Sequence, residues 1–266
     1  MEYPLKSEEE IAQMRAAGLI VWEAHQVARE RLRPGVTTAD INRAVEEFIY
    51  SRGALPLFKG VPGTRIPFPA ATCISVNDEV VHGIPGPRAL REGDLVGIDI
   101  GVKYNGWCGD AAVTHAVGSV SPEARRLMEV TEEALRLAIV LMGRKTFWSQ
   151  VAREIQRFVE RAGFSVVEAL TGHGIGREMW EGIQAPNYFS PEYRKCGDFA
   201  LQPGVVVAVE PMVNAGSKEV YHKEDTWTVA TQDGRPSAHF EHTVAVTRAG
   251  VMVLTAGPEG QGWAMP

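Results

Sequence analysis

The sequence has few cysteines, few histidines and no long apolar run. Its three cysteines are odd in number and form no Cys-x-x-Cys pair, which predicts reduced thiols rather than a disulfide framework or a zinc knuckle. The longest apolar runs cover residues 137–143 and 205–209, whereas a helix needs roughly 20 apolar residues to cross a bilayer. The opening residues, MEYPLKSEEE, lack the apolar stretch of a secretory signal. We therefore expect a cytoplasmic protein without a membrane partner.

Positive charge is scarce as well. Lysine and arginine number 27 against 33 acidic residues, which leaves a formal net charge of −6. Proteins that bind nucleic acid through its phosphates carry a basic surface, so we expect no nucleic-acid partner. Hydrophobic residues make up 45% and charged residues 23%, a globular composition that excludes disordered, collagen-like and coiled-coil chains. A length of 266 residues suits one large domain or two small ones.

Hydrophobic periodicity predicts an α/β (α+β) protein with four long helices. Ser7 and Glu10 form a capping box before the first helix. The helices are expected at 7–33, 39–52, 122–142 and 148–162. Short strands are expected at 71–76, 80–82, 94–102, 107–117, 165–170, 205–211, 226–231, 239–247 and 251–255, whereas 171–201 is polar and irregular.

Part of this pattern occurs twice. The helical segment 41–53 recurs 110 residues later, with three identical residues. The apolar strand that ends at Asp99 recurs 111 residues later and ends there at Glu210, so an acid closes the strand in both copies. We interpret the chain as a single domain over 1–266, made of two pseudo-symmetric halves at about 7–118 and 119–255.

Two acids lie on facing strands of a predicted hairpin. Asn105-Gly106 between apolar runs is a strong signal for a two-residue hairpin loop, which would place Asp110 opposite Gly101. Because side chains alternate along a strand, Asp99 and Asp110 then lie on the same face, roughly 7–8 Å apart at the backbone. Two ionised carboxylates that converge there repel each other unless a cation lies between them.

Three more candidate ligands occur in apolar or glycine-rich contexts. Glu210 ends an apolar strand, Glu241 lies among strand residues, and His173 is flanked by glycines that allow a close backbone approach. With the two hairpin acids they make one histidine and four carboxylates, a mixed set of ligands that suits two divalent ions of the Mn, Fe, Co or Zn kind. Two such ions about 3.5–4 Å apart can hold a hydroxide and polarise a carbonyl.

Seven short motifs follow one another along the chain. They are SVNDEVVHGIP (75–85), GIDI (97–100), GD (109–110), TGHGIG (171–176), VEPMV (209–213), DTWTV (225–229) and FEHTV (240–244). In order and spacing they resemble the type I methionine aminopeptidases, metallopeptidases of the pita-bread fold, and the likeness runs from about residue 9 to 255. It implies two pseudo-symmetric αβ halves around a central antiparallel sheet, and a monomer with the ribosome as a further candidate partner. It also implies hydrolysis of the N-terminal methionine from peptides and nascent chains with a small second residue, through a hydroxide that bridges two divalent metal ions.

The resemblance assigns a role to each candidate ligand. Asp110 and Glu241 would bridge the two ions. Asp99 would complete one metal site, and His173 with Glu210 the other. Glu210 would also act as general base, since a carboxylate beside the attacking water can take and return its proton.

The resemblance also implies a substrate pocket. His82 would contact the substrate near the scissile peptide and help to steady the tetrahedral oxyanion. The methionine side chain would bind beside it, in a soft apolar slot formed by Phe68, Cys73, Met179 and Trp227.

The sequence departs from the family pattern after His173. The family places a second histidine seven residues further on, in a His-Glu-x-Pro-Gln segment, but here Trp180 and Ile183 stand for the histidine and the proline. An indole donates one hydrogen bond and can neither accept one nor shuttle a proton. Because general acid–base groups typically contribute about 10²–10⁴-fold, we expect a weakened or retuned peptidase with Trp180 in contact with the substrate.

Two other functions are compatible with this substitution. One is a pita-bread peptidase of altered specificity, for example for Xaa-Pro ends. The other is a weakly catalytic or non-catalytic peptide-binding relative, although five intact candidate ligands argue against it. The remaining histidines receive no role and are expected to be structural or exposed; they are His25, His115, His222, His239 and His242.

Overall fold

The computed structural model describes residues 3–262. Its helices are α1 (Glu8–Arg29), α2 (Thr38–Ser51), α3 (Pro122–Met142), α4 (Trp148–Arg161) and the short α5 (Pro191–Cys196). The four long helices occupy the predicted segments, and the capping box of α1 is confirmed. The backbone N–H of Glu10 donates to the Ser7 hydroxyl over 3.2 Å, and the N–H of Ser7 donates to the Glu10 carboxylate over 3.0 Å.

One large sheet of antiparallel strands forms the centre of the molecule. Along its main path it consists of β1 (Leu55–Pro56), β4 (Leu95–Tyr104), β5 (Trp107–Ala116), β14 (Glu241–Thr247), β9 (Val206–Val209), β7 (Gly172–Gly174) and β8 (Gln184–Ala185), with β2 (Cys73–Val76) on β4 and β15 (Gly250–Val253) on β14. The long β4–β5 hairpin and the strand β14 bring the two ends of the chain into one sheet.

Two small sheets flank the large one. The first contains β13 (Ser237–His239), β10 (Met212–Asn214) and β6 (Ser165–Val166), and the second contains β11 (Val220–His222), β12 (Val229–Thr231) and β3 (Glu79–Val81).

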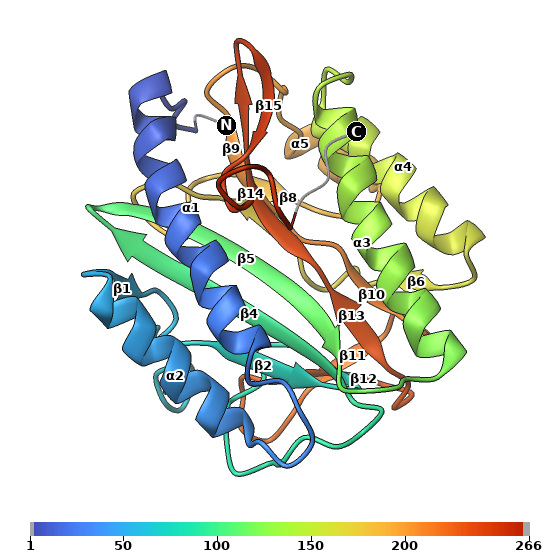
Figure 1. Ribbon diagram of the computed structural model, residues 1–266. Helices are drawn as coiled ribbons and strands as arrows, with labels where there is room; N and C mark the ends of the chain where they lie inside the picture. Colours follow the sequence, from blue (N-terminus) through green and yellow to red (C-terminus); the bar gives the residue numbers. More distant parts are fainter. Residues whose placement is uncertain (1–2, 263–266) are drawn as a thin grey trace.

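The long helices pack in two pairs on the sheet. Figure 1 shows α1 and α2 over the part that contains the β4–β5 hairpin, and α3 and α4 over the part that contains β14 and over the adjoining small sheet with β13. A separate apolar core lies under each pair. The division of the chain into halves at about 7–118 and 119–255 stays a prediction. No helix within residues 3–262 is long and apolar enough to span a membrane.

Glycines let α1 lie directly on β5. A Cβ atom built on Gly18 would lie 2.0 Å from the carbonyl oxygen of Leu254, and one on Gly109 would lie 3.0 Å from the backbone nitrogen of Gly18. A side chain at Gly18 would collide with this backbone, and one at Gly109 would fit only if α1 moved slightly away. This close approach sets the distance between α1 and β5 next to Asp110.

Several predicted strands are shorter or divided in the structure. The segment 205–211 ends as β9 at Val209, since Pro211 has no N–H to donate to a ladder, and the chain resumes as β10. The segment 239–247 is divided at Phe240, where the chain passes from a small sheet to the large one. The segments 165–170 and 226–231 keep only β6 and β12. Residues 171–201, expected to be irregular, contain β7, β8 and α5.

Candidate active site

One cavity of about 310 Å³ opens over the large sheet and brings together every candidate site residue. The five candidate ligands, the candidate catalytic histidine and the candidate pocket residues all line it, namely Asp99, Asp110, His173, Glu210, Glu241, His82, Phe68, Cys73, Met179, Trp180 and Trp227. The roles that the family resemblance gives these residues stay predictions.

The β4–β5 hairpin has the predicted register. Asn105 and Gly106 both have positive φ angles, of 50° and 79°, as a two-residue hairpin turn requires, and Asp110 is paired with Gly101. Asp99 is paired with Ala112 on the same hairpin, so Asp99 and Asp110 lie on one face. The sequence therefore placed the first two carboxyl groups correctly.

The other three side chains come from strands on the far side of β5. Glu241 is the first residue of β14 and pairs with Ala112. His173 on β7 pairs with Ala208 on β9, and Glu210 directly follows β9. The small side chains of Ala112 and Ala208 leave space between these longer polar ones.

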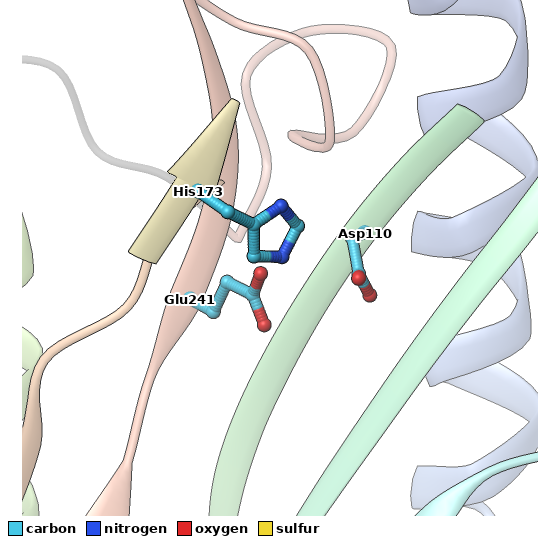
Figure 2. Close-up of side chains that lie close together, drawn as sticks. All are labelled: Asp110, His173 and Glu241. Atoms are coloured by element: carbon cyan, nitrogen blue, oxygen red, sulfur yellow. The ribbon is translucent and has the colours of Figure 1, made fainter. Parts of the chain in front are cut away.

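Three of the side chains already converge. One ligand atom each from Asp110, His173 and Glu241 lie within 4.8 Å of one another. Figure 2 shows the three groups extending from β5, β7 and β14 toward a common point. The Nε2 atom of His173 also lies 3.7 Å from Oε1 of Glu210. The arrangement forms a compact cluster of hard oxygen donors with one nitrogen donor.

Hydrogen bonds to the main chain hold the cluster in place. The hydroxyl of Thr243 accepts from the backbone N–H of Asp110 over 2.9 Å and donates to its carbonyl over 2.8 Å. The side-chain amide of Asn187 donates to the carbonyl of Glu210 over 3.0 Å. The backbone that carries both carboxyl groups is thereby fixed independently of what the carboxyl groups bind.

If the four carboxyl groups were all ionised, no lysine or arginine in the described cavity wall would compensate their charge. Burial raises the pKa of Asp110 to about 7. Burial, and then neighbouring acids, raise the pKa values of Asp99, Glu210 and Glu241 well above their usual range. Among the described residues that line the cavity, none is a lysine or an arginine.

Several oxygen atoms of these groups are buried without a hydrogen-bond partner among the described residues. They are Oδ1 of Asp99, Oδ1 of Asp110 and Oε1 of Glu241. Buried polar atoms of this kind are costly unless a ligand satisfies them. Unpartnered carboxylate oxygens, clustered negative charge and a nearby imidazole together fit divalent metal ions.

His173 is suited to bind a metal through one ring nitrogen. Its Nδ1 lies 3.1 Å from the carbonyl oxygen of Gly174, and an N–H at Nδ1 can donate there. That tautomer leaves the lone pair of Nε2 directed toward Glu210. Burial lowers the pKa of His173, so the ring is neutral, as a metal ligand must be.

His82 adopts an unusual backbone conformation at the cavity wall. Its φ angle is +59°, a region that residues other than glycine rarely occupy. The next residue, Gly83, approaches the main chain so closely that a Cβ atom would lie 2.3 Å from the carbonyl oxygen of Ile74. Burial, and then His222, lower the pKa of His82 to about 4, so its imidazole is neutral at pH 7 with one N–H to donate.

An apolar slot adjoins the carboxyl cluster. Phe68, Cys73 and Met179 are buried side by side, and Trp227 packs on them. The rings of Phe68 and Trp227 meet edge to face at 5.2 Å, and the indole N–H of Trp227 donates to the carbonyl of Ile66 over 3.0 Å. Burial and the nearby acids raise the pKa of Cys73 well above its usual range, so its sulfur is a neutral thiol.

Trp180 stands between this cavity and a second one. Its side chain is 61% exposed, and its ring meets His173 edge-on at 6.4 Å. The second cavity, about 550 Å³, shares Trp180 and His173 with the first and continues along Gln184 to Tyr193. A large exposed indole at the junction of two cavities is available for contact with a ligand that extends through both.

The loop that carries Trp180 is anchored by a buried ion pair. The ammonium of Lys6 lies 2.5 Å from the Glu181 carboxylate, and the two side chains are 6% and 14% exposed. The same carboxylate accepts from the backbone N–H groups of Arg177 and Glu178. The sequence contained no signal for this pair, because its partners lie 175 positions apart.

One site residue was missed in the sequence. His239 was expected to be structural or exposed, and it is indeed buried, but its ring lies among the candidate ligands. Its Nε2 is 3.9 Å from Oε2 of Glu210 and 3.8 Å from Oε2 of Glu241. The available signal was its spacing, two residues before Glu241, which puts both side chains on one face of an extended segment.

The comparisons with known proteins agree with this geometry. The sequence profile of metallopeptidase family M24 matches residues 12–248. Methionine aminopeptidase 1 of Bacillus subtilis is 44% identical over 250 residues, which span 94% of this chain and 98% of that protein. The methionine aminopeptidase of Clostridium perfringens is 46% identical over 251 residues, with the same two coverages.

A solved structure extends the likeness to three dimensions. The crystal structure of the methionine aminopeptidase from Thermotoga maritima superposes with a TM-score of 0.89 at 40% identity, and the match covers 96% of this chain and 99% of that one. The predicted pita-bread fold is thereby confirmed. By profile, sequence and fold alike, this chain belongs to metallopeptidase family M24.

Proposed function

We propose that this protein is a methionine aminopeptidase, which hydrolyses the N-terminal methionine from peptides and nascent proteins whose second residue is small. The observation that carries the proposal is a single cavity in which an apolar slot adjoins four carboxyl groups and an imidazole. Relatives that carry this name match nearly the whole chain, which supports it and disfavours a peptidase for Xaa-Pro ends.

We infer that the carboxyl cluster binds two divalent metal ions of the Mn, Fe, Co or Zn kind. Asp99, Asp110, His173, Glu210 and Glu241 would hold these ions. The unpartnered buried oxygens and the raised pKa values, which mean that ionised carboxylates lack a compensating cation among the described residues here, support this assignment. When bound, such ions act as Lewis acids that polarise the scissile carbonyl and neutralise the carboxylates.

The chain itself would supply proton transfer and orientation. Glu210 would accept a proton from the attacking water and return it to the departing amine. His82 would donate its single N–H to the oxygen of the scissile carbonyl, where charge develops in the transition state. Phe68, Cys73 and Met179 would hold the methionine side chain away from water, which fixes the peptide bond relative to Glu210.

Trp180 would contact the peptide beyond the scissile bond. It occupies the position at which the family has a histidine, and it lines both cavities. Its N–H can replace the donor function of that histidine but not a proton-transfer function. We therefore infer an active peptidase with a reduced chemical rate, rather than a binding protein.

A peptide panel tests the proposal. Peptides that begin Met-Ala, Leu-Ala and Ala-Pro are incubated with the protein and Mn²⁺ or Co²⁺, and the released amino acid is quantified. Release from Met-Ala alone supports the proposal. Release from Ala-Pro alone would instead assign the Xaa-Pro specificity, and peptide binding without release under either metal would assign a binding protein.

We further propose that the protein acts in the cytoplasm as a monomer that encounters nascent chains at the ribosome. Size-exclusion chromatography with light scattering tests the monomer. Co-sedimentation with ribosomes tests the contact, and a protein that stays in the supernatant at every ionic strength would remove the ribosome from the proposal.

A further inference from the structure

His239 lies beneath the carboxyl cluster rather than in the cavity wall. It is the last residue of β13, and its side chain is 4% exposed. It is absent from the residues that line the cavity, whereas Glu210 and Glu241 line it and lie 3.9 and 3.8 Å from its Nε2. The imidazole therefore lies next to the two glutamates without forming part of the cavity wall.

The ring nitrogen that faces these glutamates has no hydrogen-bond partner within residues 3–262. An unsatisfied buried donor or acceptor costs about 1–3 kcal/mol, and a leucine of similar volume would avoid that cost. The carboxylate oxygens are the polar groups that the structure places next to this nitrogen. A hydrogen bond would form if the distance between Nε2 and one of these oxygens became shorter by about 1 Å or less.

The main chain of His239 cannot withdraw from this position. Its N–H donates to the hydroxyl of Thr114 over 2.9 Å, and its carbonyl accepts from the same hydroxyl over 2.8 Å. Its backbone also pairs with Met212, two residues after Glu210. Hydrogen bonds and pairing to two neighbouring strands therefore fix the base of the imidazole.

We propose that His239 is a positioning residue, whose Nε2–H donates to the carboxylates of Glu210 and Glu241 and orients them for metal binding. The inference rests on the proposed metal site. A hydrogen bond on the outer side of a ligating carboxylate fixes its orientation, and loss of such a partner typically weakens metal binding by about 10- to 100-fold. His239 would thus support the proposed general base and one further proposed ligand together.

Two substitutions separate this role from space filling. His239→Leu keeps an apolar body but removes the donor, and His239→Gln keeps an N–H donor of comparable reach. His115→Leu is the matched control, because it removes another histidine, half-buried and with a buried unpartnered ring nitrogen, from a different cavity. Mn²⁺ affinity is measured by calorimetric titration of metal-free protein, and the thermal midpoint of each metal-free variant is recorded alongside.

We expect His239→Leu to bind Mn²⁺ about 10- to 100-fold more weakly than the wild type, and His239→Gln to stay within about threefold of it. The visible spectrum of the Co²⁺-loaded protein should change in the leucine variant and not in His115→Leu. Equal affinities for the leucine variant and the wild type would overturn the proposal. So would equal losses in the leucine and glutamine variants at matched thermal midpoints.

This outcome is independent of the proposed activity. If the wild type binds Mn²⁺ but releases no methionine, the proposed function fails while the role of His239 is still decided by the affinities. If the wild type binds no metal at all, both proposals fail together, and the spectra and titrations show it directly.

Discussion

The Asp110→Asn variant is expected to be more stable than the wild type when metal is absent and the pH is neutral. Burial raises the pKa of Asp110 from its ordinary 3.8 to about 7, so between these values the folded protein holds a proton that the unfolded chain has released. The folded state therefore loses stability as the pH rises through this window, and asparagine removes that loss. At about 1.36 kcal/mol for each pKa unit, the free energy of unfolding of the wild type falls relative to that of the variant by on the order of 4 kcal/mol across this window.

The assay is urea unfolding of both proteins in the presence of EDTA, at intervals between about pH 4 and pH 8. The quantity compared is the difference in the free energy of unfolding between the two proteins. This difference cancels the opposite pH dependence that the buried histidines give to both. Burial lowers the pKa of His25 to about 4 and that of His239 to about 3, so these groups make the fold more stable as the pH rises toward 6.5. A difference between the two proteins that stays constant across the range would refute the reasoning.

Added metal provides the control for this prediction. If Asp110 is a ligand, saturating Mn²⁺ stabilises the wild type more than the asparagine variant, because a bound ligand adds to the stability of the state that binds it. With saturating Mn²⁺ at neutral pH, the wild type should then be the more stable of the two proteins. Identical gains in both proteins would show that Asp110 does not bind the metal.

Three further substitutions, with Lys59→Met as a control for one of them, test other parts of the structure. Trp180→His is expected to raise kcat on a Met-Ala-Ser peptide by about 10²-fold, since it restores a group that can both donate and accept a proton, and an unchanged kcat would remove this explanation. Lys6→Met removes the cation from the partly buried Glu181 carboxylate and should lower the free energy of unfolding by about 2 kcal/mol. Lys59→Met, which breaks a more exposed ion pair, should cost less than about 1 kcal/mol, and equal losses would contradict the argument. Phe68→Ala opens the apolar slot and should raise KM about tenfold with a smaller change in kcat, whereas a loss confined to kcat would place the methionine elsewhere.

The hairpin acids were predictable because local sequence fixes their geometry. Asn105-Gly106 determines the turn, the turn determines the register, and the register puts Asp99 and Asp110 on one face. The convergence of His173 and Glu241 on the same point depends on strand order, which no local pattern states. The family motifs supplied that information, and the sheet order agrees with it.

The parts that escaped the sequence are long-range and polar. The spacing of His239 from Glu241 does not by itself distinguish it from a buried structural histidine, and its proximity to Glu210 depends on the pairing of β13 with β10. The Lys6–Glu181 pair likewise joins the first residues of the fold to the Trp180 loop. The short strands between 165 and 231 were misjudged because two- and three-residue pairings are set by their neighbours rather than by periodicity.

The most direct test of the central claim is methionine release from a Met-Ala-Ser peptide by the wild type and by Glu210→Gln, with bound metal quantified in the same samples. The account predicts release by the wild type when it holds divalent metal. It predicts a fall of about 10² or more in kcat for the glutamine variant, beyond what any loss of bound metal explains. A wild-type protein that holds two Mn²⁺ or Co²⁺ ions per chain and releases no methionine would contradict the account.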